Sequence, residues 1–187
     1  MRGLEGRWLF LVAGAMLAVA GCGGSEEEKT PSFVELFPAN NAVSGWSENT
    51  TVGAAGVESA TTDLAVEGLI DGAAEPFIAR DWVAFGWQQY VNGSYHIDLQ
   101  MWQMASAAVA TDLYTGLLVE GRYDTTFWET ITLGDESRVW DTQSQLTGWW
   151  FNVRSGAYYL EAAVTPNDAD ARTAAETFLA AIVADLP

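Results

Sequence analysis

The sequence predicts an α+β fold: a single domain with an antiparallel sheet of about five to six strands and helices packed on one face. Two hairpin patterns, each with period-two alternation on both sides of a Gly-containing turn, predict the sheet. Three segments with apolar residues at helical spacing lie before, between and after these hairpins. Hairpins grouped between helices are typical of α+β domains, and residues 33–187 are long enough to bury one core.

The first helix is expected in residues 62–77, with Thr62 as its N-cap. Its apolar residues fall on one side at helical spacing. Pro76 lacks a backbone N–H and disfavours a helical conformation at Glu75, so a break is expected there. Residues 49–60, which precede this helix, are rich in Gly, Ser, Thr and Ala and predict a loop.

The second helix is expected to begin after Ser106 and to end at Gly121, because Ser is a favoured N-cap and Gly a favoured stop. Strands are expected near residues 126–133 and 137–140. The third helix is expected to begin after Asn167 or Asp168. Its apolar stripe is Ala171, Ala174, Ala175, Phe178, Leu179, Ile182 and Leu186.

The first hairpin, in residues 82–104, is expected to turn at Asn92-Gly93, a pair that suits a two-residue turn. One face then collects Trp82, Ala84, Gly86, Gln88, Tyr90, Tyr95, Ile97, Leu99 and Met101. The other collects Phe85, Trp87, Gln89, His96, Asp98, Gln100 and Trp102. A three-residue loop would shift the pairing by one residue, so that each set of residues in the first strand would share a face with the other set of the second strand. We favour the two-residue turn because Ala84 and Gly86 would let a helix approach the sheet.

The second hairpin, in residues 148–164, is expected to turn at Ser155-Gly156. In that arrangement Trp149, Phe151 and Val153 share a face with Tyr158, Leu160 and Ala162. The alternation predicts a half-buried antiparallel pair.

Residues 1–21 are typical of a signal peptide that ends in a lipidation motif. Arg2 and Arg7 flank Glu5, and an uncharged apolar run follows over residues 8–20. This run is shorter than the roughly 20 residues of a membrane-spanning helix. Val19-Ala20-Gly21-Cys22 resembles the lipobox of bacterial lipoproteins, in which the cysteine receives a diacylglyceryl group and often an N-acyl chain. Cys22 is the only cysteine, so a disulfide within the chain is excluded.

The expected location is the bacterial cell envelope, with Cys22 as the lipid attachment point. Residues 22–32 are rich in Gly, Ser and Glu and predict a disordered tether. Several acyl chains would hold the protein stably on a membrane, whereas one chain binds only marginally. Gly23 is not the aspartate that marks inner-membrane retention in enteric bacteria, so the outer membrane is expected if the host has one.

The charge excludes some classes of partner. After removal of residues 1–21 the chain retains six basic and 24 acidic residues, a net charge of −18. Nucleic acids and anionic headgroups need a basic surface, so neither is expected as a ligand. An unknown protein or glycan partner remains open.

The side chains for catalysis and metal binding are sparse. His96 is the only histidine and has no Gly-x-Ser-x-Gly nucleophile to accompany it. No glycine-rich phosphate loop is present, and no cofactor is expected. Four carboxylates at steps of four residues could gather a hard cation or form a solvated helix face, and we favour the solvated face: Asp63, Glu67, Asp71 and Glu75.

Eight tryptophans in the mature chain keep a carbohydrate-binding alternative open, because indole faces stack on sugar rings. Trp87, Asp98, Gln100 and Trp102 would form such a face. A carboxylate-based hydrolase is a weaker alternative, because the sequence gives no separation between two acids. The leading interpretation is a lipid-anchored, non-enzymatic envelope domain that binds a partner or ligand.

Residues 69–77 carry Ile70-Asp71-Gly72-Ala73-Ala74-Glu75, followed after one residue by Phe77. This segment resembles a bacterial domain family of unknown function with the motif Ile-(Asn/Asp)-Gly-Ala-Ala-Glu before an aromatic residue. Further points of resemblance are Pro38, Gly45-Trp46, the strand over residues 97–104 and Ser155-Gly156-Ala157-Tyr158. Residues 110–116 depart from the family, which has Ala-Phe-Gly there. The resemblance implies a secreted or anchored domain and no activity, with Asp71 and Glu75 as its polar motif positions.

Overall fold

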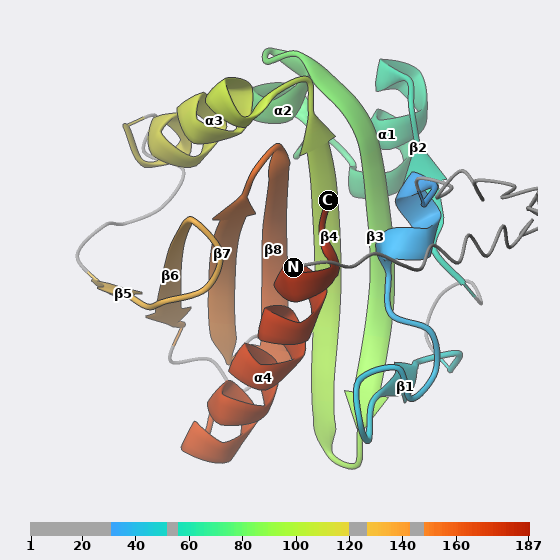
Figure 1. Cartoon of the computed structure of the whole chain (residues 1–187), viewed down its shortest axis with the longest axis vertical. Helices are drawn as coiled ribbons and strands as arrows, with labels where there is room; N and C mark the ends of the chain where they lie inside the picture. Colours follow the sequence, from blue (N-terminus) through green and yellow to red (C-terminus); the bar gives the residue numbers. More distant parts are fainter. Residues whose placement is uncertain (1–30, 52–55, 120–126, 143–147) are drawn as a thin grey trace, which may run out of the picture. The chain divides into compact units, whose positions relative to one another are not determined.

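An eight-stranded, mostly antiparallel sheet is the centre of the computed structural model, which describes residues 31–51, 56–119, 127–142 and 148–187 (Figure 1). The strand order is β1-β3-β4-β8-β7-β6-β5, and β2 also pairs with β3. The strands are β1 Ser47–Glu48, β2 Glu58–Ala60, β3 Trp82–Asn92, β4 Tyr95–Met104, β5 Trp128–Thr130, β6 Glu136–Asp141, β7 Trp149–Ser155 and β8 Tyr158–Thr165. The helical elements are the 3₁₀ helix η1 Phe33–Leu36 and the α-helices α1 Asp63–Ile70, α2 Glu75–Ile78, α3 Ala107–Val119 and α4 Ala169–Asp185.

The α+β class and the mostly antiparallel sheet are confirmed, but the predicted number of strands is wrong. The additional strands include β1 and β2, which lie in or beside a segment predicted as a loop. Each has only two or three residues, too few for an alternation pattern. Both pair with the outer edge of β3, so they cover an edge that would otherwise present unpaired backbone groups.

Both hairpins place their side chains on the predicted faces, with the exception of Trp82, although each turn lies one residue later than expected. Asn92 pairs with Tyr95, and Ser155 pairs with Tyr158. The two-residue loops are therefore Gly93-Ser94 and Gly156-Ala157, with Gly at the first position and positive φ of 62° and 54°. Glycine in the first position is typical of a type II′ turn. The register moves by two residues as a result, which leaves the side chains on their predicted faces except at Trp82. A β-bulge between Trp82 and Ala84 turns Trp82 to the opposite face, where its ring meets Trp102 edge to face with ring centres 5.6 Å apart, so its predicted place beside Ala84 and Tyr90 is wrong.

The two faces of the sheet carry separate apolar clusters. One cluster contains Ile97, Leu99 and Met101 of β4 together with the buried side of α4, which crosses β8 and β4 in Figure 1. The other contains Phe85, Trp102 and Tyr159 together with buried residues of α1, α2 and α3. Because successive residues of a strand point to opposite faces, these clusters lie on opposite sides of the sheet. The prediction that the helices pack on one face is therefore not confirmed.

The helix predicted in residues 62–77 is two helices. Thr62 caps α1, since its hydroxyl accepts from the Ala65 N–H at 3.4 Å. The chain then leaves the helix at Asp71, which has a φ of 39°, and at Gly72, with a φ of 75°. The predicted break at Pro76 is wrong, because this proline lies in the first turn of α2, where a missing N–H costs no hydrogen bond.

The starts of the other two helices agree with the sequence. Ser106 accepts from the Val109 N–H at 3.3 Å before α3, and Asp168 accepts from the Ala171 N–H at 2.7 Å at the N-cap of α4. The expected end of α3 at Gly121 lies outside the described residues, as does the start of the strand expected near residue 126. The buried residues of α4 belong to the predicted apolar stripe: Ala171, Ala175, Phe178, Leu179 and Ile182.

Candidate functional site

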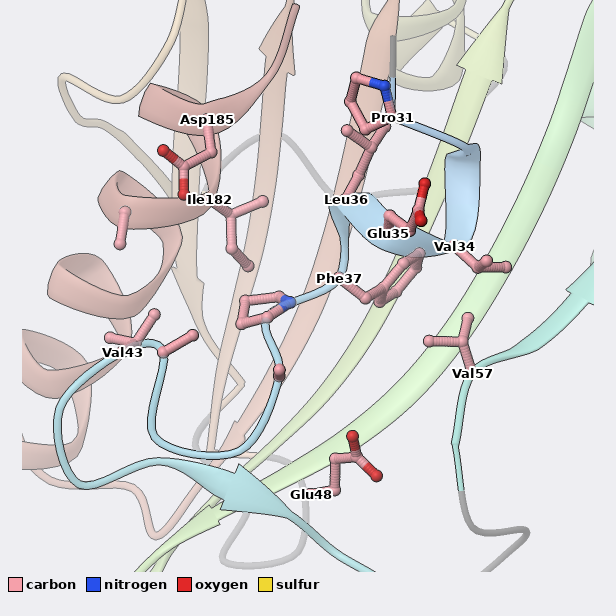
Figure 2. Close-up of a pocket in the computed structure, with 14 residues that line it drawn as sticks. Pro31, Val34, Glu35, Leu36, Phe37, Val43, Glu48, Val57, Ile182 and Asp185 are labelled. Atoms are coloured by element: carbon pink, nitrogen blue, oxygen red, sulfur yellow. The ribbon is translucent and has the colours of Figure 1, made fainter. Parts of the chain in front are cut away.

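The larger of two described clefts lies between residues of the segment 31–57 that precedes α1 and the last turns of α4, and Figure 2 shows its lining, which runs from Pro31 to Glu48 and adds Val57 on that side. We call it the N-terminal cleft. Its volume is about 580 Å³, within the range of sites for small ligands. Its walls come from η1, the loop after it, β1, the residue Val57 before β2, and the C-terminal end of α4. Eleven of its 14 lining residues are apolar or proline, and the other three are Glu35, Glu48 and Asp185.

An aromatic pair at the start and just after the end of η1 fixes one wall of the cleft against β3. Phe33 and Phe37 meet edge to face with ring centres 5.9 Å apart. A Cβ atom on Gly86 of β3 would lie 2.6 Å from the Phe37 ring and 3.0 Å from the Phe33 ring. The absence of a side chain at Gly86 therefore lets the pair lie directly on the strand. This confirms the expectation that a small residue here allows a helix to approach the sheet.

The loop that follows η1 is tied to the same strand. The Tyr90 hydroxyl donates to the Pro38 carbonyl at 3.1 Å, and Trp46 packs on Phe178 of α4 with ring centres 5.0 Å apart. Gly45 has a φ of 83°, and a Cβ there would lie 2.9 Å from the Asn92 side chain. The loop thus connects β3, the tip of the first hairpin and α4, and its backbone passes through a conformation that suits glycine.

The charged residues that line the cleft are all acidic: Glu35, Glu48 and Asp185. None of its lining residues is basic. Burial raises the pKa of the Tyr90 phenol, and the charge of Glu48 raises it further, so the field of this carboxylate extends to the sheet beneath the loop. Glu35 accepts from the backbone N–H and the hydroxyl of Ser32 at 2.6 and 2.7 Å, which holds it at the start of η1.

Asp71 and Glu75, the polar residues of the family-like motif, lie at the junction of α1 and α2. Both are exposed, Asp71 in the left-handed region at the end of α1 and Glu75 at the start of α2. Asp63 accepts from the Trp82 indole N–H at 2.9 Å. Within the described ranges, no group of three or more His, Cys, Asp or Glu residues is arranged to hold a metal ion.

Trp87 and Asp98 contact each other across the first hairpin, on the face that also carries α1 to α3. The Trp87 indole N–H donates to the Asp98 carboxylate at 2.5 Å, and the Gln89 amide donates to its other oxygen at 3.1 Å. Burial raises the pKa of Asp98, while the hydrogen bonds from Gln89 and Trp87 lower it, and burial is the largest of these effects. Both Trp87 and Asp98 are partly exposed.

Trp102 shares this face, as predicted, but it is fully buried. Its ring stacks on Phe77 of α2 with ring centres 3.9 Å apart and planes 4° from parallel. It therefore offers no open face to a sugar ring, and the expected pairing of Trp87 with Trp102 in an exposed platform is wrong. Neither described cleft is lined by Asp71, Glu75, Trp87 or Asp98, so the structure does not bring these predicted residues together in a cleft.

A second cleft of about 400 Å³ includes Tyr114, Trp128 and Arg138 in its lining. The Arg138 guanidinium lies 4.1 Å from the centre of the Tyr114 ring and donates to Asn152 at 3.0 Å. Asn152 and Tyr159 in turn donate to Glu161 at 3.5 and 3.1 Å. Burial is the main cause of a raised pKa at Tyr114, with Arg138 opposing it. This network joins α3 to three strands, and the sequence analysis missed it because its residues are far apart in the chain.

The N-terminal cleft was missed for the same reason. Its apolar stretch, residues 33–43, is visible in the sequence, but nothing local indicates that residues 181–185 lie opposite. Cys22 and residues 23–30 of the tether predicted over residues 22–32 lie outside the described residues. The last two tether residues, Pro31 and Ser32, are described, and Ser32 donates two hydrogen bonds to Glu35 of η1. Among the helices that are described, none has the length and apolar character needed to span a membrane.

Comparison with models of known protein families gives no match for the chain. Comparison with curated proteins likewise finds no relative.

Proposed function

We propose that this chain is a lipid-anchored, non-enzymatic domain of the bacterial cell envelope that binds a ligand in the N-terminal cleft. The carrying observation is the cleft itself, which combines mainly apolar walls with a few charged groups, as small-molecule sites do. The lipobox at Cys22 and the tether support the envelope location. The outer membrane is the proposed location if the host has one.

The cleft is tested by filling it. Ala42 is exposed and lines the cleft, so Ala42→Trp should occupy part of the volume without removing a core contact. We expect the variant to weaken binding of a water-soluble apolar probe, 4-phenylbutan-1-ol, at least threefold in ligand-observed NMR, because the probe and the indole compete for one space.

Ala108→Trp is the matched control, because Ala108 is an exposed alanine on α3 and does not line the cleft. It should leave probe binding unchanged. Equal binding by the wild type and Ala42→Trp, or no binding by the wild type, would contradict the assignment of the site.

A glycan-binding module remains the alternative, and the contact between Trp87 and Asp98 favours it. A partly exposed indole beside a carboxylate can stack on a sugar ring and accept a hydroxyl hydrogen bond. Titration with envelope polysaccharides should then change the tryptophan fluorescence of the wild type and not of Trp87→Phe.

We also propose that the chain belongs to the bacterial domain family of unknown function that residues 70–75 resemble. The hydrolase alternative is ranked lower, since no described cleft contains two of its three candidate carboxylates, Asp71, Glu75 and Asp98.

A further inference from the structure

We infer that the ligand of the N-terminal cleft is a cationic amphiphile, with one ammonium group on an apolar body. This inference rests on the proposed function, which places ligand binding in this cleft. The cleft supplies both halves of such a site. Its walls are apolar, and its only charged lining groups are carboxylates. Figure 2 shows these carboxylates on three separate segments around the apolar side chains.

Two of the carboxylates are available for a ligand. Glu35 is held by Ser32, as described above. Glu48 on β1 and Asp185 at the end of α4 have no basic residue within 4 Å among the parts of the chain that the structure describes. Asp185 is exposed and Glu48 is partly buried, so an ammonium group can approach both from solvent.

The basic residues that the structure describes do not neutralise this site. The described ranges contain four arginines, and each is engaged elsewhere. Three form ion pairs with carboxylates at 2.7 to 2.9 Å, and the fourth, Arg138, is buried against Tyr114 and Asn152. A cationic ligand would therefore supply the charge complement that the described arginines do not, whereas an anionic ligand would be repelled by the lining carboxylates.

The apolar walls of the cleft indicate that the ligand also has an apolar body. A simple metal cation or a polyamine without an apolar body would leave Leu36, Phe37, Val43 and Ile182 without a partner in the cleft. An alkyl or aryl body removes this surface from water, which stabilises the complex by about 25 cal/mol per Å² of apolar area buried. The charge then selects among ligands of similar shape.

The experiment compares three probes that share one apolar body and differ only in charge: 4-phenylbutylammonium, 4-phenylbutan-1-ol and 4-phenylbutyrate. The mature lipidated protein is reconstituted in vesicles of neutral phosphatidylcholine, and protein-free vesicles provide the blank. We expect the ammonium probe to bind about threefold to tenfold more tightly than the alcohol, the range for one or two partly exposed ion pairs. The carboxylate probe should bind more weakly than the alcohol.

The charge preference is assigned to the cleft with isosteric variants. The double variant Glu48→Gln, Asp185→Asn should reduce the preference for the ammonium probe to less than twofold while keeping the binding of the alcohol. Asp170→Asn, which removes an exposed carboxylate at the other end of α4, should keep the full preference.

The outcomes separate the two levels of the proposal. Equal affinities for the ammonium probe and the alcohol, or a full preference in the double variant, would overturn the cationic class and leave the cleft as a binding site. Failure of all three probes to show binding that Ala42→Trp weakens would instead overturn the proposed function.

Discussion

Asp98 illustrates at the scale of one residue how the first hairpin controls a charge. The carboxylate accepts from Trp87 and Gln89 on the neighbouring strand, and these bonds stabilise its ionised form. Burial opposes them and is the larger effect, so the pKa of Asp98 is raised in the folded protein. The ionised carboxylate is therefore less favourable in the folded state than in the unfolded chain.

This raised pKa predicts the sign of a pH effect on stability. Between the unfolded value of about 3.9 and the higher folded value, the folded state binds more protons, so stability falls as pH rises. Asp98→Asn keeps the shape and an acceptor oxygen but lacks the titration. We expect the free energy of unfolding of the wild type, relative to this variant, to fall as pH rises through that window. Urea unfolding at a series of pH values measures it.

The Trp87 indole N–H provides an independent readout of the same group. Its NMR resonance should titrate in the wild type with a midpoint above about 3.9 and should not titrate in Asp98→Asn. A wild-type midpoint at or below that value, or a relative stability that rises with pH, would show that burial does not dominate at Asp98.

At the scale of elements, the contact between η1 and β3 determines whether the N-terminal cleft exists. The Phe37 ring occupies the space where a side chain at Gly86 would lie. Since Phe37 is only 6% exposed and belongs to the apolar cluster under α4, the ring has little room to move. The absence of a Cβ atom at Gly86 thus allows η1 and Phe37 to pack directly on β3.

Gly86→Ala should therefore destabilise the protein by about 1 to 3 kcal/mol, the usual cost of overpacking a core. It should also weaken probe binding in the cleft, because η1 must move away from β3. Gly68→Ala is the control, since a Cβ at this exposed position in α1 meets nothing within 4 Å and should stabilise the helix by up to about 1 kcal/mol. Chemical denaturation measures both changes, and equal effects of the two substitutions would contradict this account.

The same scale shows what could be predicted from the sequence. The faces of both hairpins beyond Trp82 follow from period-two alternation, which a register shift of two residues does not alter. The β-bulge that turns Trp82 to the other face interrupts this alternation and leaves no local signal in it. The turns differ from the prediction because the sequence pairs Asn92-Gly93 and Ser155-Gly156 suggest loops with glycine in the second position. In the structure the glycines occupy the first loop position instead. The break in the first helix was assigned to Pro76 because proline disfavours a helix interior, but Asp71 and Gly72 end the helix earlier.

At the scale of the whole molecule, the candidate site lies beyond sequence reasoning. Trp102 lies on its predicted face but is buried, because α2 packs over this part of the sheet. The N-terminal cleft combines residues from the segment 31–48 and Val57 with residues from the segment 181–185, which only the completed fold brings together. The acidic composition, in contrast, was visible in the sequence and agrees with the negative lining of the cleft.

The proposed attachment of the whole molecule to a membrane would depend on the thiol of Cys22. Cys22→Ala should abolish metabolic labelling with radioactive palmitate and leave the chain with its signal peptide, because the acyl groups need the sulfur and processing follows lipidation. Ser25→Ala, which alters the tether but keeps Cys22, should be labelled and should fractionate with membranes like the wild type. One chain alone anchors only marginally, so stable membrane retention of the wild type in high salt would indicate several chains. Normal labelling of Cys22→Ala would exclude Cys22 as the attachment point and, with it, the anchored form of the proposed function.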